Sequence, residues 1–189
     1  PSALITFNPN PYTIINNIKS RDYHIISRKK KYDLIEKIGI DILLEIKFDS
    51  LISNMSAHQF LEKFIINPFK PTDIIVGYDH HFGKDREGDL EFLEKHQDKY
   101  SYTLHTIEPF GLNGKTISSS LIRKLILSGE IHTVNTYLGW NYQISGLVIS
   151  GSKLGREISF PTANIALSST NQLIPGNGVY FIEGIIEGK

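Results

Sequence analysis

The sequence predicts a mixed α/β protein, in which a parallel sheet flanked by helices is followed by a smaller all-β unit. Up to about residue 129, short apolar runs alternate with amphipathic stretches, which is typical of a parallel sheet with helices on both faces. From residue 142 onward only strand-like runs remain, separated by turns rich in Gly, Pro and Ser. We therefore expect two domains, residues 1–139 and 140–189.

The elements follow from the spacing of the apolar residues and from cap residues. Residues 3–7 form an apolar run of strand length, and Ser27 and Gly39 are suited to begin and end the first helix. The next strands of the parallel sheet are expected over 41–48, 73–78 and 102–107, and the next helices over 56–65, 88–96, 118–129 and 130–139. In the second unit, strands are expected over 142–150, 163–167 and 179–186.

Composition excludes several classes of protein. Lys and Arg together number 20, as do Asp and Glu, and a formal charge of zero argues against a nucleic-acid backbone as partner. The absence of cysteine excludes disulfides, thiolate catalysis and cysteine metal sites. No apolar run approaches the roughly 18 residues that span a bilayer, and no secretory signal is visible, so we expect a cytoplasmic protein. Strand-like runs at both ends indicate a part of a longer protein.

Polar loops follow three of the predicted strands, at residues 8–11, 77–89 and 117–123. In open parallel sheets, ligands bind beyond the carboxyl ends of the strands. Ser118 or Ser119 is expected to cap a helix with free backbone N–H groups just inside, and Arg123 follows about one turn later. This combination suits a phosphate. An ordinary capped helix with a surface arginine fits these residues equally well.

The loop at 77–89 offers a second group of candidates. Asp79 can accept from an adenine amino group or a ribose hydroxyl, Phe82 can stack on a ring, and Arg86 can reach phosphate. The alternative is a long loop in which Asp79 is a turn residue. A metal at His80 and His81 is disfavoured, because adjacent side chains point apart and no third ligand has typical spacing. Nor do residues 114–116 (GKT) end a Walker A loop, since position 109 is proline.

The stretch GSKLGREISFPTAN (151–164) joins two predicted strands. Gly151 and Gly155 are four residues apart, which fits neither dinucleotide nor Walker A spacing. A loop with Lys153 and Arg156 can still wrap phosphates with its backbone amides. Thr162 and Asn164 offer neutral oxygens on one face of an extended segment, and such oxygens suit Mg²⁺ that shares phosphate oxygens. From the residues alone, a simple turn is the favoured interpretation.

Taken together, these segments resemble the prokaryotic bifunctional riboflavin kinase/FMN adenylyltransferase (FAD synthetase) family. The matching stretches, in the family's order, are TFNPNP, DILLEIKFD, VGYDHHFGKDREGD, ISSSLIR, LGWNYQISGLVISGSKLGREISFPTANI and GVYFIEG. The resemblance implies a Rossmann-like nucleotidyltransferase domain followed by the start of an antiparallel β-barrel. It also implies two ATP- and Mg²⁺-dependent reactions, riboflavin to FMN and FMN to FAD.

The resemblance also implies roles for single residues. Ser118, Ser119 and Arg123 would contact the ATP phosphates of the adenylyltransferase, with the Asp79 loop beside nucleotide and flavin. In the kinase, Gly151, Lys153, Gly155 and Arg156 would cover ATP, while Thr162 and Asn164 would hold Mg²⁺ and phosphate. No catalytic residue is assigned, because the family's catalytic glutamate lies beyond Lys189.

The chain also departs from the family's pattern. The initial Gly-Asn-Phe-Asp-Gly-x-His-x-Gly-His motif is absent, Asn10 stands where the family has a histidine, and His80 where it has an aromatic residue. We therefore expect an incomplete transferase, inactive as given, whose parent protein has both activities. The alternative is a degenerate homologue that binds nucleotide or flavin without turnover. A pantetheine-phosphate type of adenylyltransferase is disfavoured, because it has no counterpart of residues 151–164.

Overall fold

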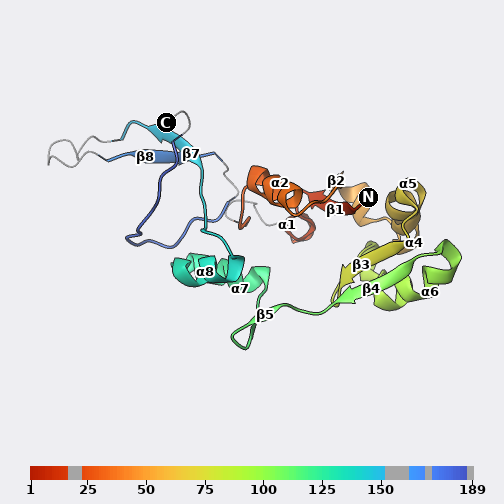
Figure 1. Ribbon diagram of the computed structural model, residues 1–189. Helices are drawn as coiled ribbons and strands as arrows, with labels where there is room; N and C mark the ends of the chain where they lie inside the picture. The colour runs from red at the N-terminus through yellow and green to blue at the C-terminus, as the bar shows by residue number, and fades with distance from the viewer. Residues whose placement is uncertain (17–22, 152–161, 169–171, 187–189) are drawn as a thin grey trace. The chain divides into compact units, whose positions relative to one another are not determined.

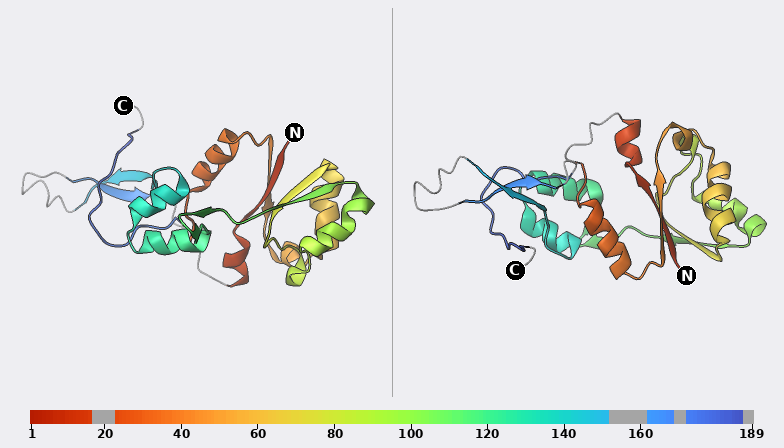
Figure 2. Two further views of the ribbon diagram at one scale, coloured as in Figure 1. Left: turned by 60° about the horizontal axis from the view of Figure 1, so that its bottom comes forward. Right: turned by 90° about the horizontal axis from the view of Figure 1, so that it is seen from above.

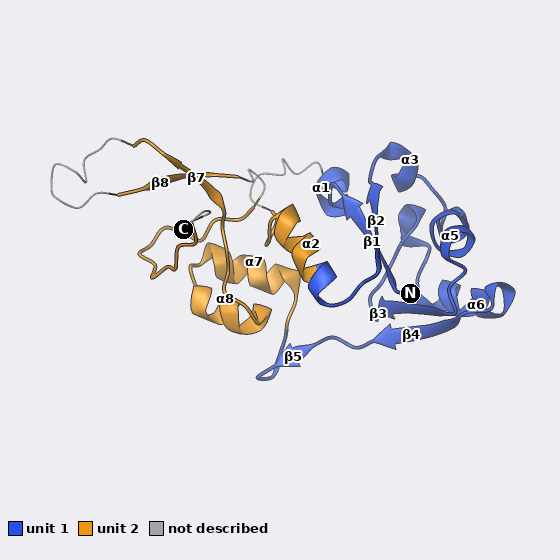
Figure 3. Cartoon of the chain, turned by 45° about the horizontal axis from the view of Figure 1, so that its top comes forward, with its two compact units in different colours: residues 1–19, 35–116 blue, residues 20–34, 117–189 orange. Residues whose placement is uncertain are grey.

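The computed structural model describes residues 1–16, 23–151, 162–168 and 172–186. The chain divides into two compact units, which Figure 3 shows in different colours. Unit 1 consists of Pro1–Lys19 and Ile35–Thr116, and unit 2 of Ser20–Leu34 and Ile117–Lys189. Unit 2 therefore combines a short early segment with the last part of the chain.

Four strands of unit 1 form two parallel pairs, which can be followed in Figures 1 and 2. β1 (Ala3–Asn8) pairs with β2 (Ile42–Lys47), and β3 (Asp73–Gly77) pairs with β4 (Thr103–Ile107). The parallel pairing that the alternation predicts is thus confirmed. Among the described residues no ladder joins β1–β2 to β3–β4, so the expected sheet is present as two parts.

Helices lie between the strands of unit 1 in the chain. They are α1 (Pro11–Ile15), α3 (Ser50–Ser53), α4 (Ala57–Phe60), the π-helix η1 (Leu61–Ile66), α5 (Asn67–Phe69), the 3₁₀-helix η2 (Lys84–Arg86) and α6 (Leu90–Tyr100). The helix α2 (Arg28–Lys37) contains residues of both units. Ser27 caps α2 as predicted, since its hydroxyl accepts from the Lys30 N–H at 3.2 Å.

The helix predicted over 56–65 is correct at its beginning but not in its continuation. Ser56 and Gln59 form a reciprocal capping box that begins α4. The chain then widens into the π-helix η1 in place of a continuous α-helix. Pro68 lies in α5, two residues after the end of η1, and its missing N–H removes a helical hydrogen bond. Lys70, at φ +43°, ends the helical segment.

A continuous hydrophobic core joins the elements of unit 1. Its buried members are Ile46, Ala57, Phe60, Leu61, Ile74, Phe82, Leu93 and Tyr102. They come from both strand pairs, from α4 and η1, and from α6. Burial of several large apolar side chains at about 1.5–3 kcal/mol each gives this unit its main source of stability.

A small hairpin in unit 1 was missed in the sequence. β5 (Gly111–Leu112) and β6 (Lys115–Thr116) pair antiparallel around Asn113 and Gly114, both at positive φ. An Asn-Gly pair is the usual signal for a two-residue hairpin turn. The residues GKT therefore belong to this hairpin.

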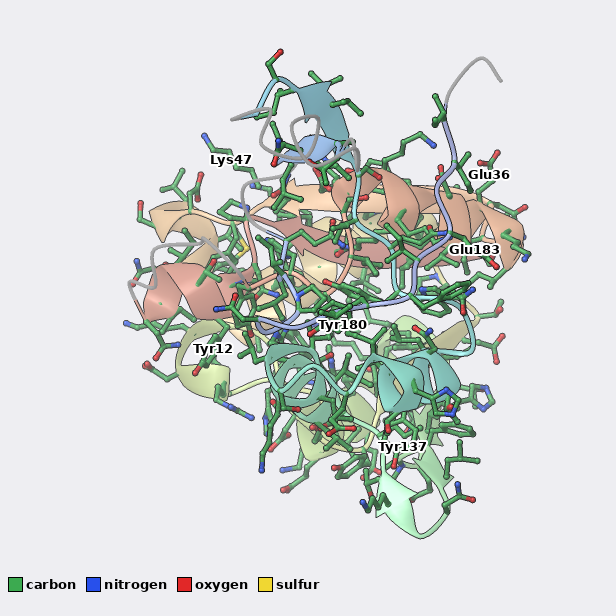
Figure 4. All side chains as sticks on the ribbon, turned by 90° about the vertical axis from the view of Figure 1, so that its left-hand side faces the viewer. Tyr12, Glu36, Lys47, Tyr137, Tyr180 and Glu183 are labelled. Carbon is green, nitrogen blue, oxygen red and sulfur yellow. The ribbon has the colours of Figure 1, made fainter. Side chains whose placement is uncertain are left out.

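The core of unit 2 is built on a helix pair. α7 (Ser119–Leu127) and α8 (Ile131–Leu138) bury Ile122, Ile126 and Val134 together with Leu173. Gly139, at φ +76°, ends α8 in the left-handed conformation that glycine favours. The Tyr180 hydroxyl donates to the Gly176 carbonyl at 2.5 Å, in the segment labelled in Figure 4.

The β part of unit 2 is smaller than predicted. β7 (Gly146–Ile149) and β8 (Asn164–Leu167) pair antiparallel, in agreement with the predicted change from parallel to antiparallel strands. The strand expected over 179–186 is wrong: this segment forms no ladder with the described residues, and the Val179 and Phe181 side chains are fully exposed. No helix in the described ranges is long and apolar enough to cross a membrane.

Candidate functional site

In unit 1, Asn10 follows the end of β1 and begins α1. Its side-chain oxygen accepts from the Tyr12 N–H at 2.9 Å, and Pro11 occupies the first helical position. This is an ordinary N-cap arrangement, since proline lacks the N–H that a helix start leaves unpaired. The Asn10 oxygen is thus used within the loop, and its amide N–H₂ is the group left to meet a ligand.

Asp79 lies exposed just beyond the end of β3. The His80 N–H donates to the Gly77 carbonyl at 3.0 Å and closes the turn. A Cβ at Gly77 would lie 3.6 Å from the Asp79 carboxylate, so the carboxylate folds back over the strand end. Burial lowers the pKa of His80, and the charge of His81 adds to this effect while Asp79 opposes it. The strand end therefore presents a carboxylate beside an imidazole that favours its neutral form.

The rest of this loop is docked on the beginning of α4. The backbones of Phe82 and Gly88 exchange two hydrogen bonds, of 2.9 and 3.0 Å. The Glu87 carboxylate accepts from the Ala57 N–H at 2.5 Å. A Cβ at Gly83 would lie 2.6 Å from the Ala57 nitrogen, so only glycine fits at this φ of +74°. The loop conformation is therefore fixed by packing.

Phe82 and Arg86 have different surroundings in this docked loop. The Phe82 ring is 8% exposed and packs against Phe60 and Phe92, with centroid distances of 5.6 and 5.8 Å. Packing accounts for Phe82 without a ligand. Arg86 is exposed at φ +62°, a conformation that non-glycine residues adopt rarely. Of the two, Arg86 is the side chain available to an anion.

In unit 2, the start of α7 has the predicted form. The Ser118 hydroxyl oxygen accepts from the Leu121 N–H at 3.2 Å, which identifies Ser118 as the N-cap and Ser119 as the first helical residue. The first turn contains no acidic side chain. An α-helix leaves its first amides without intrahelical partners, and the hydroxyl of a capping serine still has a proton to donate. These donors are suited to an anion.

Arg123 is held by a residue that no sequence motif predicts. Its Nε–H donates to the Tyr23 carbonyl at 2.9 Å, and its guanidinium carbon lies 3.9 Å from the centroid of the Tyr23 ring. Burial lowers the pKa of the adjacent His24, and the charges of Arg123 and Lys31 add to the effect. Tyr23 and Arg123 are 100 positions apart, so no local sequence pattern could reveal their contact.

The structure describes three of the kinase candidates. Asn164 pairs with Ile149 in the β7–β8 ladder, and a Cβ at Gly151 would collide with the Asn164 side-chain amide. A side chain at position 151 would therefore displace the Asn164 amide. Thr162 and Asn164 are both exposed. Lys153, Gly155 and Arg156 lie outside the described residues.

The donors at this ribbon fit a magnesium ion that arrives with a nucleotide. Thr162 and Asn164 supply neutral oxygens at solvent, and Mg²⁺ completes its shell with water and phosphate oxygens. A cluster of three or more His, Cys, Asp or Glu side chains arranged to hold a metal does not occur in the described parts of the chain.

Comparison with known proteins gives a consistent family. A model described as FAD synthetase matches residues 1–121, and one described as Riboflavin kinase matches residues 138–189. A Listeria monocytogenes protein is 31% identical over 189 residues, covering 100% of this chain and 59% of the relative. A Bacillus subtilis protein is 32% identical over 188 residues, covering 99% and 58%. Both are named bifunctional riboflavin kinase/FMN adenylyltransferase.

A further relative and a solved structure extend this comparison. The protein of the same name from Buchnera aphidicola subsp. Schizaphis graminum is 36% identical over 185 residues, which is 96% of this chain and 58% of that protein. A crystal structure described as a macrolide-efflux protein from Streptococcus pneumoniae matches with a TM-score of 0.81 and 27% identity, over 95% of this chain and 58% of that one. The chain thus spans about three fifths of the length of the curated relatives it matches.

Proposed function

The chain belongs to the bifunctional riboflavin kinase/FMN adenylyltransferase family, and we propose that the whole protein converts riboflavin to FMN and FMN to FAD with ATP. The observation that carries this proposal is the succession of the two family matches, residues 1–121 and 138–189, in one chain. We assign the two activities to domains comprising residues 1–139 and 140–189. The first would be a Rossmann-like nucleotidyltransferase and the second an antiparallel β-barrel.

The parallel strands form two separate pairs, but the core that the pairs share supports a single larger sheet. β1–β2 and β3–β4 bury their apolar residues in one shared core, although no described ladder connects them. An edge strand leaves a row of unpaired N–H and C=O groups. We propose that a further strand lies between the pairs in the whole protein and completes the sheet.

In the adenylyltransferase reaction, we assign phosphate binding to Ser118, Ser119 and Arg123. An oxygen of the FMN phosphate attacks the α-phosphorus of ATP, the bond from that phosphorus to the bridging oxygen breaks, and pyrophosphate leaves. No covalent enzyme intermediate is needed, so positioning and charge stabilisation provide the catalysis. The α7 amides and hydroxyls would meet the phosphates as hydrogen-bond donors, and the Arg123 guanidinium would offset their charge.

We assign the loops of unit 1 to contacts with nucleoside or flavin. Asp79 is suited to accept from the adenine amino group or a ribose hydroxyl, and Arg86 to reach a phosphate. Asn10 offers its amide N–H₂ where the family has a histidine. We assign Phe82 to supporting the loop by packing and not to stacking on a ligand ring, because its own ring is buried against Phe60 and Phe92.

In the kinase reaction, the terminal ribityl hydroxyl of riboflavin attacks the γ-phosphorus of ATP, and ADP leaves. We assign Gly151, Lys153, Gly155 and Arg156 to the loop that covers the ATP phosphates. Thr162 and Asn164 would hold Mg²⁺ and a phosphate oxygen. When bound with ATP, Mg²⁺ neutralises charge on the phosphate oxygens. The contact between Gly151 and the Asn164 amide supports this assignment, because it places the start of the loop beside a proposed ligand.

The test measures both reactions in the whole protein. Riboflavin plus ATP should yield FMN, and FMN plus ATP should yield FAD and pyrophosphate, each followed by chromatography with fluorescence detection. Thr162→Ala should abolish riboflavin phosphorylation and leave FAD formation from FMN unchanged. Survival of both activities would contradict the Mg²⁺ assignment. Binding of ATP or FMN without either product would identify a degenerate homologue instead.

A further inference from the structure

We propose that Tyr23 is a positioning residue for the adenylyltransferase reaction, and that it acts by fixing the guanidinium of Arg123 beside α7. The inference rests on the proposed function, because it assumes that Arg123 contacts phosphate. Tyr23 lies outside every segment that carries the family resemblance. Its two contacts with Arg123 are the basis of the proposal.

Both contacts restrain the same side chain from one residue. The Tyr23 carbonyl accepts from the Arg123 Nε–H at 2.9 Å, and the Tyr23 ring lies 3.9 Å from the guanidinium carbon. A guanidinium has five N–H donors, and the hydrogen bond occupies one of them. The four donors on the terminal nitrogens are those that suit a bidentate phosphate contact. A long arginine that is fixed before the substrate binds also loses less rotamer entropy on binding.

The backbone that carries Tyr23 is itself held by the riboflavin kinase region. The Leu173 N–H donates to the His24 carbonyl at 2.9 Å, and the Gln172 side-chain amide donates to the Ile25 carbonyl at 3.3 Å. Gln172 and Leu173 are 4% and 2% exposed. Tyr23 belongs to the region matched as FAD synthetase, and Gln172 to the region matched as riboflavin kinase. Gln172 and Leu173, from the region matched as riboflavin kinase, thus hold the backbone next to Tyr23, which belongs to the region matched as FAD synthetase.

A second arginine–tyrosine pair provides a matched control in the same unit. Arg28 lies over the Tyr32 ring at 5.4 Å, within one helix and four residues apart. This pair is local and contacts neither Arg123 nor α7 in the contacts described. Tyr32→Leu therefore removes a tyrosine that contacts an arginine but leaves the Tyr23 ring beside Arg123 in place.

The activity test compares four forms of the whole protein. Tyr23→Leu should lower kcat for FAD formation roughly 10- to 100-fold, the size expected when a positioned group shifts by about 1 Å. Riboflavin phosphorylation should change less than about twofold, because it does not use Arg123. Both substitutions keep the backbone carbonyl, but Tyr23→Phe also keeps the ring and should retain FAD formation, as should Tyr32→Leu. Full activity of Tyr23→Leu, or an equal loss in Tyr23→Phe, would overturn the proposal.

A spectroscopic test separates this proposal from the proposed function. In the ¹⁵N-arginine-labelled chain, the Nε–H resonance of Arg123 should show a ring-current shift that Tyr23→Phe retains and Tyr23→Leu removes, with the assignment taken from Arg123→Lys. Absence of that shift in an active protein would refute the positioning role alone. Its presence in a protein that makes no FAD would refute the proposed function and leave the contact established.

Discussion

The core of unit 1 and the β7–β8 ribbon of unit 2 contain similar apolar strand sequences but bury them differently. In β3, Ile74 (8% exposed) and Val76 pack on a core to which Leu61 and Leu93 contribute at 0% and 1% exposure, while Ile75 on the other face is exposed. In β7, the residues LVI are all exposed, with Leu147 at 73%. Strand sequence sets the pairing of backbones, while burial needs a second layer that packs against the strand. The described residues supply that layer to β3 and not to β7.

Leu61→Ala tests the buried side of this comparison most directly. Deletion of a fully buried leucine should lower the free energy of unfolding by about 2–5 kcal/mol. The matched change in the ribbon, Leu147→Ala, should alter it by less than about 0.5 kcal/mol. Urea unfolding followed by circular dichroism measures both. Similar losses in the two variants would show that β7 is covered in solution and would break the comparison.

Tyr102 is a titrating group in the same core. Burial raises the pKa of Tyr102 to about 12, and its hydroxyl donates to the Leu93 carbonyl at 2.5 Å. A raised tyrosine pKa favours the neutral folded form, so its contribution is complete below about pH 10 and is lost as pH rises through about 12. Between about pH 10 and pH 12, the free energy of unfolding should fall by roughly 2–3 kcal/mol through the ionisation of Tyr102.

Tyr102→Phe is the control for this pH dependence. Its free energy of unfolding, measured in urea at pH 9.5 and 11.5, should fall less than that of the unchanged chain, because the variant has no hydroxyl to ionise at this position. Equal slopes in the two proteins would mean that Tyr102 ionises as an exposed tyrosine does. The buried core of unit 1 would then be more open than the structure indicates.

The sequence predicted those parts of the fold that depend on local physics. Apolar runs placed β1 to β4, and short polar residues placed the caps at Ser27 and Ser118, because strand burial and helix capping involve residues close in the chain. It did not predict that β1–β2 and β3–β4 form separate ladders, nor that residues 179–186 form none. Those outcomes depend on which distant segments pack together, which a local pattern does not contain.

The candidate site shows the same limit. Sequence motifs selected Ser118, Arg123 and Asp79, and the structure describes Ser118 at the start of α7, Arg123 in the middle of that helix and Asp79 just beyond the end of β3. The stacking ring expected at Phe82 is instead packed among other aromatic residues, since hydrophobicity does not distinguish a ligand platform from a core residue. Neither the sequence around Tyr23 nor that around Arg123 contains a pattern that predicts their contact. Residue types therefore predict chemistry more readily than they predict partners.

Gly83→Ala sharpens the comparison at the docked loop. Gly83 has φ +74°, and its added Cβ would meet the Ala57 backbone. Gly39 has φ +85° with nothing within 4 Å, so Gly39→Ala should cost only the conformational penalty, about 1–2 kcal/mol. Gly83→Ala should cost roughly 1–3 kcal/mol more in the free energy of unfolding, because the loop must separate from α4. Equal costs, measured in urea, would show that the loop is not docked on α4.

Gly151→Ala applies the same substitution at the open ribbon, where the smallest effect on stability is expected. The added Cβ would meet the end of the Asn164 side chain, which is exposed and can rotate, so the free energy of unfolding should change by less than about 0.5 kcal/mol. The effect should appear in function, because the displaced amide belongs to a proposed ligand of Mg²⁺. The KM for ATP in riboflavin phosphorylation should rise roughly five- to tenfold, equivalent to about 1 kcal/mol of binding, with FAD formation from FMN unchanged.

Gly184→Ala, at an exposed glycine with nothing within 4 Å, is the control. An unchanged KM in Gly151→Ala would separate Asn164 from ATP binding, whereas a large loss of stability would show that the ribbon is packed after all.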